Sequence, residues 1–235
     1  MESQKMLIIG NKPYIKLPIG GLIDEFEENC RCGMAIVTPE YNNGSKLSHL
    51  FLCNHSYERL YNRPVNREDF LTYYNDSSRE SDYLEKFWDF FQENKHHYKG
   101  IYYSHTHLVG QWNQMLKEWG CPYRFTKTPR TGMSVIFESL FRQLKVFVIG
   151  FSLYDDLRRG WGSIYKDGYD ENNSCHSRDD EINILLWLHN NGRLDVTLCM
   201  LEDTETPTLR CENIKPTPDS LCLLNKVYGN VVIGE

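Results

Sequence analysis

The chain has 235 residues, of which 40% are hydrophobic and 25% are charged, and its formal net charge is −6. This apolar content excludes an intrinsically disordered chain, because burial of so many apolar side chains offsets the entropy lost on folding. The acidic balance argues against a nucleic acid as the partner, since binding to a phosphate backbone needs a basic surface.

Neither the apolar runs nor the cysteines point to export. No apolar run reaches the roughly 18 residues that a membrane-spanning helix needs, and the run at residues 6–10 is too short for a signal peptide. The eight cysteines form no Cys-x-x-Cys pair, so we interpret them as reduced and mostly structural. We therefore expect a cytoplasmic protein without a transmembrane segment, and leave peripheral membrane contact and the oligomeric state open.

In the first half of the chain, short apolar runs alternate with helical patterns. The apolar runs predict strands at residues 6–10, 34–37, 50–53 and 100–103. Apolar side chains recur at helical spacing within residues 81–94 and 107–119, and Gly120 is a natural end for the second helix.

The second half continues the alternation. Met133, Ile136, Phe137, Leu140 and Phe141 predict an amphipathic helix. The apolar residues 145–150 predict a strand buried on both faces. Further elements are expected as a short strand at 123–125, a helix at 178–191 with a capping box at Ser177-Arg-Asp-Asp180, and a strand at 194–201. This order predicts an α/β fold with a Rossmann-like, mostly parallel sheet flanked by helices, in one domain over residues 1–235.

Two polar stretches interrupt this order, at about residues 55–81 and 157–177. Long polar insertions in compact α/β domains are often lids or binding loops. The second stretch lies between a core strand and a core helix, so we expect it over the carboxyl edge of the sheet, where open α/β sheets bind ligands.

Two short segments could contact a ligand at that edge. Thr131 and Gly132 begin the amphipathic helix and could seat a phosphate on its free N–H groups, although Thr131 could equally be an ordinary N-cap. Gly150-Phe-Ser-Leu-Tyr154 follows the buried strand. There Gly150 would let a ligand approach the backbone and Tyr154 offers a hydroxyl, or the segment is merely a turn.

His176 is the best candidate for a catalytic residue, because it lies just before a helix and after the second polar stretch. It could act as a general base, or it could be a surface or capping residue. His105 and His107 could share a strand face, but no third ligand follows at a diagnostic spacing. No Asp-x-Asp sequence occurs, so we expect neither a metal site nor a cofactor.

Taken together, these segments resemble the sialyltransferases of glycosyltransferase family 29. Pro129-Arg130-Thr131-Gly132, the helix after it and the strand ending in Gly150-Phe151 are similar to the family's small motif. His176 to Glu181 has the spacing of its very small motif, His-x4-Glu. The long motif is resembled by Ile9-Gly10-Asn11 and by Gly44-Ser45-Lys46 with residues 50–54, although Gly33 stands where the family has an asparagine. Bacterial sialyltransferases of family 42 show a similar order, and the resemblance covers residues 6–54 and 126–200.

The resemblance implies a GT-A-variant fold and metal-independent, inverting transfer of sialic acid or a related acid sugar from a CMP-sugar donor to a glycan acceptor. It implies that His176 is the general base. The implied donor contacts are Asn11, Asn54, Thr131, Gly132, Gly150, Phe151, Ser152, Tyr154 and Tyr165. The alternatives are a transferase for another CMP-activated acid sugar such as Kdo, and a catalytically inactive module that binds nucleotide or glycan.

Overall fold

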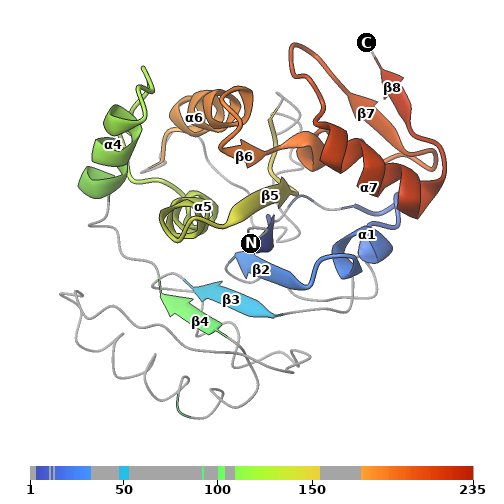
Figure 1. Cartoon of the computed structure of the whole chain (residues 1–235), viewed down its shortest axis with the longest axis horizontal. Helices are drawn as coiled ribbons and strands as arrows, with labels where there is room; N and C mark the ends of the chain where they lie inside the picture. The colour runs from blue at the N-terminus through green and yellow to red at the C-terminus, as the bar shows by residue number, and fades with distance from the viewer. Residues whose placement is uncertain are drawn as a thin grey trace.

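A six-stranded parallel sheet forms the centre of the protein (Figure 1). The computed structural model describes residues 4–10, 12, 14–32, 48–52, 92, 100–103, 109–153 and 176–234. The strands are β1 (Lys5–Ile9), β2 (Glu28–Cys32), β3 (His49–Leu52), β4 (Gly100–Tyr103), β5 (Lys145–Ile149) and β6 (Leu194–Asp195). Their order in the sheet is β4-β3-β2-β1-β5-β6, which confirms the predicted α/β fold with a parallel sheet.

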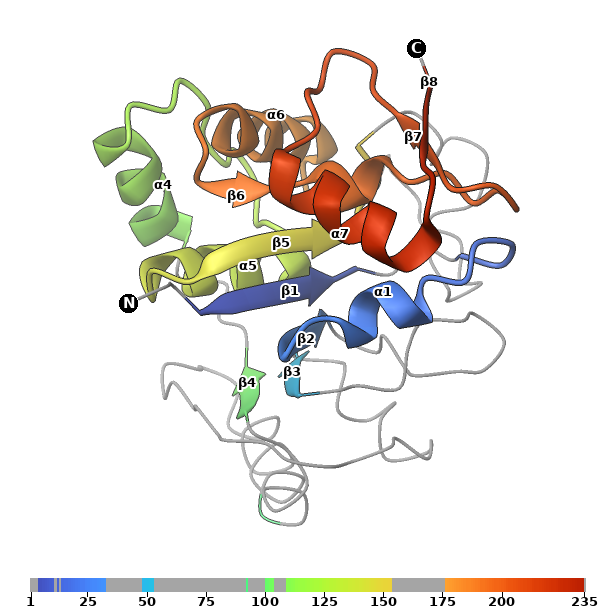
Figure 2. The same cartoon turned by 45° about the vertical axis from the view of Figure 1, so that its right-hand side comes forward.

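Helices cover both faces of this sheet. They are α1 (Gly20–Asp24), α4 (Val109–Glu118), α5 (Thr131–Phe141), α6 (Arg178–Asn190) and α7 (Pro218–Tyr228). Figure 1 shows α4, α5 and α6 on one side of β5, and Figure 2 shows α1 beside α7 on the other side of β1 and β5. A small parallel sheet of β7 (Thr208–Arg210) and β8 (Val232–Gly234) follows β6.

The helix patterns at residues 107–119, 133–141 and 178–191 correctly predicted α4, α5 and α6. Aromatic packing explains why α4 lies against α5. The ring of Phe137 on α5 lies 5.7 Å from Trp112 and 6.2 Å from Trp119, centroid to centroid. Offset and tilted ring pairs at such distances add to the free energy of apolar burial. Gly120, two residues after the last residue of α4, has a φ of +79°, as expected for a helix end.

Two predicted strands differ from the structure. Residues 123–125 form no strand, because the side chain of Asn113 on α4 accepts the Phe125 N–H at 2.8 Å and donates to the Phe125 carbonyl at 3.0 Å. The strand predicted at 194–201 ends at Asp195, whose carboxylate accepts the Thr197 N–H at 2.8 Å. A 3₁₀ turn, η5 (Thr197–Met200), replaces its second half. The predicted strand at 34–37 and helix at 81–94 lie outside the described residues, apart from Gln92.

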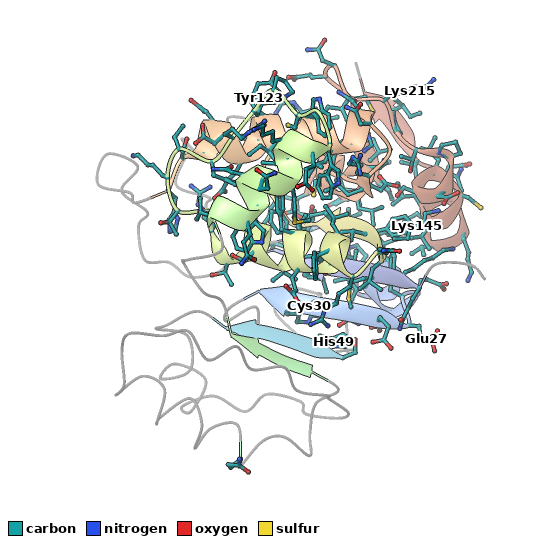
Figure 3. All side chains as sticks on the ribbon, turned by 60° about the vertical axis from the view of Figure 1, so that its left-hand side comes forward. Glu27, Cys30, His49, Tyr123, Lys145 and Lys215 are labelled. Carbon is teal, nitrogen blue, oxygen red and sulfur yellow. The ribbon has the colours of Figure 1, made fainter. Side chains whose placement is uncertain are left out.

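Strand β2 has no apolar run that could have predicted it, since its sequence is Glu-Asn-Cys-Arg-Cys. It is nevertheless central, and Figure 3 shows Cys30 on β2 beside His49 on β3, its partner in the sheet register. The buried Glu28 carboxylate lies 2.6 Å from His49 Nε2. Polar side chains with such partners can occupy a sheet interior without a large desolvation cost.

Candidate active site

The candidate site lies at the carboxyl edge of the sheet, where the strand order reverses between β1 and β5. In open α/β sheets this reversal leaves a crevice that binds ligands. The Gly10 N–H donates to the Ile149 carbonyl at 2.8 Å and the Lys12 N–H to the Gly150 carbonyl at 3.0 Å, so the two strand ends are joined. Helices α5 and α6 each lead into the next strand of the sheet, so their N-termini face this same edge.

Three glycines pack closely at this edge: Gly10 and Gly132 against the ring of Phe151, and Gly150 against the backbone of Gly10. A Cβ on Gly10 would lie 2.7 Å from the Phe151 ring and 2.4 Å from the Gly150 carbonyl oxygen. A Cβ on Gly132 would lie 2.5 Å from the same ring, and Gly150 has a φ of +76°. Packing within the protein therefore explains why each of these positions holds a glycine. Gly132, Gly150 and Phe151, predicted separately as donor contacts, do lie together.

The N-terminus of α5 presents backbone N–H groups at this edge. Arg130 is the N-cap, with extended backbone (φ −66°, ψ 158°), so the alternative that Thr131 is an ordinary N-cap is wrong. The Arg130 carbonyl accepts the Met133 N–H at 2.9 Å. The N–H groups of Thr131 and Gly132 come before this bond, at helix positions that have no acceptor within the helix. Together with the helix dipole they give positive potential, which suits an anion.

The N-terminus of α6 is held against the segment that precedes α5. Ser177 is the N-cap, and its hydroxyl accepts the Asp180 N–H at 3.4 Å, as the capping sequence predicted. The Asp180 carboxylate does not complete a reciprocal capping box. It accepts instead the Thr126 N–H at 2.8 Å and the Thr126 hydroxyl at 2.6 Å. A residue 54 positions earlier in the sequence is thereby attached to α6.

Glu181 attaches the same segment at its other end. One carboxylate oxygen accepts the Arg130 N–H at 2.6 Å, and the other accepts a guanidinium N–H of Arg130 at 2.8 Å. The side chain of Glu181 is buried. Burial raises the pKa of the Glu181 carboxyl above its ordinary value, while the Arg130 charge and hydrogen bonds oppose this rise. The family-like spacing from His176 to Glu181 thus places the glutamate at the start of α5.

His176 contacts the middle of this segment. Its Nδ1 lies 2.6 Å from the carbonyl oxygen of Thr128. A carbonyl can only accept a hydrogen bond, so Nδ1 carries the proton. The neutral imidazole then carries its lone pair on Nε2, which is the tautomer that a general base needs.

The remaining predicted residues are placed as follows. Ser152 follows Phe151 and is half-buried, whereas Asn11, Asn54, Tyr154 and Tyr165 lie outside the described residues. His105 and His107 lie outside them too. Within the described ranges, no three His, Cys, Asp or Glu side chains are grouped so that they could hold a metal ion.

The described cysteine side chains give little sign of reactivity. The thiols of Cys30, Cys121, Cys199, Cys211 and Cys222 form no disulfide. Cys199 lies under the site and donates to the Val148 carbonyl at 3.1 Å. Burial raises the pKa of the Cys199 thiol to about 12, which keeps it protonated and unreactive.

Sequence reasoning did not single out Lys12. Its backbone N–H binds the Gly150 carbonyl, and its Nζ donates to the Leu201 carbonyl at 3.2 Å. Its ammonium group therefore lies at the carboxyl edge, two residues after Gly10. The sequence feature that could have identified Lys12 as a residue of this edge is its position just beyond a predicted strand.

Comparisons with known proteins identify the fold. The sequence matches no family model, and no curated protein matches it. Among solved structures, a mammalian sialyltransferase is similar with a TM-score of 0.53 and 20% identity, over 83% of this chain and 68% of that one. The sialyltransferase CstII from Campylobacter jejuni, in complex with the substrate analogue CMP-3FNeuAc, has a TM-score of 0.48 and 14% identity over 83% and 81%. The monofunctional alpha-2,3-sialyltransferase Cst-I from the same organism has a TM-score of 0.47 and 14% identity over 97% and 94%.

Of the helices in the described part of the chain, none is both long and apolar enough to cross a membrane. The parallel sheet and the helices on its two faces are the features that the chain has in common with the mammalian structure. The chain therefore has the α/β fold of a sialyltransferase.

Proposed function

We propose that the protein is a sialyltransferase-like glycosyltransferase, which transfers sialic acid or a related acid sugar from a CMP-sugar to a glycan hydroxyl. The observation that carries this proposal is the contact of His176 Nδ1 with the Thr128 carbonyl at 2.6 Å, beside the N-terminus of α5. It leaves Nε2 of the neutral ring to accept a proton, close to a helix end that suits a phosphate. The fold of the mammalian sialyltransferase supports the same assignment.

In this reaction the acceptor hydroxyl oxygen attacks the anomeric carbon of the donor, and His176 Nε2 takes the hydroxyl proton. The bond from the anomeric carbon to the phosphate oxygen breaks, and its electron pair leaves with CMP. Attack from the face opposite the leaving group inverts the anomeric carbon. The negative charge develops on the phosphate, where the N–H groups of Thr131 and Gly132 would stabilise it.

The donor site extends around this helix end. We assign Gly150, Phe151 and Ser152 to the donor-binding edge, with Asn11 and Asn54 toward the nucleoside and Tyr154 and Tyr165 toward the phosphate. The departing CMP carries a single phosphate, so the reaction needs no divalent metal. The polar stretches at about residues 55–81 and 157–177 belong to the same single domain and would bind the acceptor.

The test is the release of CMP from CMP-Neu5Ac in the presence of a glycan acceptor, by the wild type and by His176→Ala. Loss of a general base lowers kcat by about 10²–10⁴-fold. The affinity for CMP and the melting temperature should stay near those of the wild type. Turnover of CMP-Kdo alone would identify the other donor class, and CMP binding without any turnover would identify an inactive module. If His176→Ala keeps more than about a tenth of the wild-type kcat, His176 is not the base.

A further inference from the structure

The segment from Thr126 to Arg130 touches the start of α6 through every second residue. Thr126 binds Asp180, the Thr128 carbonyl binds His176, and Arg130 binds Glu181. The carbonyl that contacts the imidazole is therefore held from both directions along the chain, by Asp180 at Thr126 and by Glu181 at Arg130.

Two contacts hold the ends of residues 126–130, Thr126 with Asp180 and Arg130 with Glu181. The contact of Arg130 with Glu181 is the more buried of the two. The Glu181 side chain is 8% exposed, and its two oxygens accept the backbone N–H and the guanidinium of Arg130. Charge-assisted hydrogen bonds of this kind are shorter and stronger than neutral ones. Asp180, by contrast, binds Thr126 where the contact is exposed to solvent.

We propose that Glu181 is a positioning residue, which acts through Arg130 to hold the Thr128 carbonyl on His176 and so selects the Nδ1–H tautomer of the imidazole. The catalytic consequence rests on the proposed function, whereas the selection of the tautomer does not. A free neutral imidazole exchanges between its two tautomers, and only the Nδ1–H form leaves Nε2 able to accept a proton. If residue 130 is released, the carbonyl loses its fixed place and the Nε2–H form becomes populated.

The tautomer can be read directly from the full-length protein with ¹⁵N-labelled histidine. The two imidazole nitrogens resonate at separate positions, depending on which one carries the proton, and His176→Gln identifies the signals of this residue. We expect the Nδ1–H form in the wild type and a mixture in Glu181→Ala. In Glu181→Gln the amide oxygen can still accept the Arg130 N–H, so most of the wild-type tautomer should return.

Glu138→Ala is the matched control, because Glu138 binds Arg142 at 2.9 Å near the opposite end of α5. It removes an ion pair from the same helix and should leave the signals of His176 unchanged. If Glu181→Ala does not fold, Arg130→Pro takes its place. It removes both the backbone N–H and the guanidinium that Glu181 accepts, and the φ of −66° at residue 130 suits a proline. A folded Glu181→Ala or Arg130→Pro protein that keeps the pure Nδ1–H tautomer would overturn the proposal.

The activity measurement separates this proposal from the proposed function. Loss of the partner that orients a functional histidine typically costs about 10–100-fold. We expect Glu181→Ala to lower kcat by that factor with little change in the KM for the CMP-sugar, and Glu181→Gln to recover most of it. A changed tautomer in a protein whose wild type has no transferase activity would refute the proposed function alone. A lower kcat with an unchanged tautomer would refute the positioning role alone.

Discussion

The ring of Phe151 occupies the space that a side chain on residue 132 would need, since a Cβ there would lie 2.5 Å from two of its ring carbons. Gly132→Ala should therefore force the ring or α5 to move, and such overpacking costs about 1–3 kcal/mol of unfolding free energy. Denaturant unfolding measures this loss. Gly110→Ala on α4 is the control, because a Cβ on Gly110 has nothing within 4 Å. It should be neutral or stabilising by up to about 1 kcal/mol.

The same contact gives a second measurement. If the clash with Phe151 is the cause, Phe151→Ala should partly relieve the effect of Gly132→Ala, so that the double variant is more stable than the sum of the single changes predicts. Simple additivity would show that the ring is not the obstacle. Substitutions at residue 132 are consequently a poor probe of ligand binding, because they disturb the protein before any ligand is present.

Thr131 is the better probe of a phosphate site, since it is half-buried at the start of α5 and already carries a side chain there. Thr131→Val keeps the shape of the side chain and removes its hydroxyl. Loss of one hydrogen bond should weaken CMP binding by about 1 kcal/mol in calorimetry. Thr204→Val, at a residue whose hydroxyl binds the Thr206 carbonyl before β7, should leave CMP affinity unchanged. Equal CMP affinities in both variants would remove the Thr131 hydroxyl from the donor site.

The raised pKa of Glu181 predicts how stability depends on pH. Burial disfavours the charged form, so the folded state holds this proton to a higher pH than the unfolded chain, where the ordinary value is 4.5. The contribution of Glu181 to the unfolding free energy is therefore full below pH 4.5 and falls as pH rises through the raised pKa.

Thermal unfolding of the wild type and Glu181→Gln between about pH 4 and pH 8 tests this dependence. The glutamine variant has no proton to lose at residue 181. The melting temperature of Glu181→Gln should rise relative to that of the wild type as pH increases. If the melting temperature of the wild type instead rises relative to that of the variant, the attraction of Arg130 outweighs burial and the pKa of Glu181 is lowered.

We expect catalysis to survive chelation. Turnover of a CMP-sugar should be unchanged in excess EDTA, because a single departing phosphate can be stabilised by the N-terminus of α5. Complete loss that Mn²⁺ or Mg²⁺ restores would contradict this mechanism. It would also direct attention to His105 and His107 as metal ligands.

The strands illustrate what the sequence could predict. Lys145–Ile149 is apolar on both faces because β5 lies in the interior of the sheet, and this composition marks a strand without any other information. Glu28–Cys32 lies in the interior of the sheet as well, but the buried carboxylate of Glu28 is stabilised by His49 on β3, which lies 21 residues later in the sequence. Local patterns contain no information about such partners, so β2 could not be predicted.

The candidate site has the same limit. The position of His176 before a helix was evident from the sequence, and so was the spacing to Glu181. The contacts of Thr126 with Asp180 and of Thr128 with His176 join residues about 50 positions apart, and only the folded chain brings the segment before α5 to the start of α6. Sequence reasoning could therefore nominate the imidazole, but it could not say which of its nitrogens carries the proton.

Because Asp180 and Glu181 fix the two ends of residues 126–130 and His176 contacts the carbonyl between them, the length of this segment is its essential property. Insertion or deletion of one residue between Thr126 and Arg130 would displace the Thr128 carbonyl from His176 or break one of the two end contacts, even with every other side chain retained. Natural relatives of this protein that use the same imidazole contact should therefore vary in composition here while keeping the number of residues. A library for directed evolution can accordingly randomise Lys127, which is exposed, but should contain no change in length.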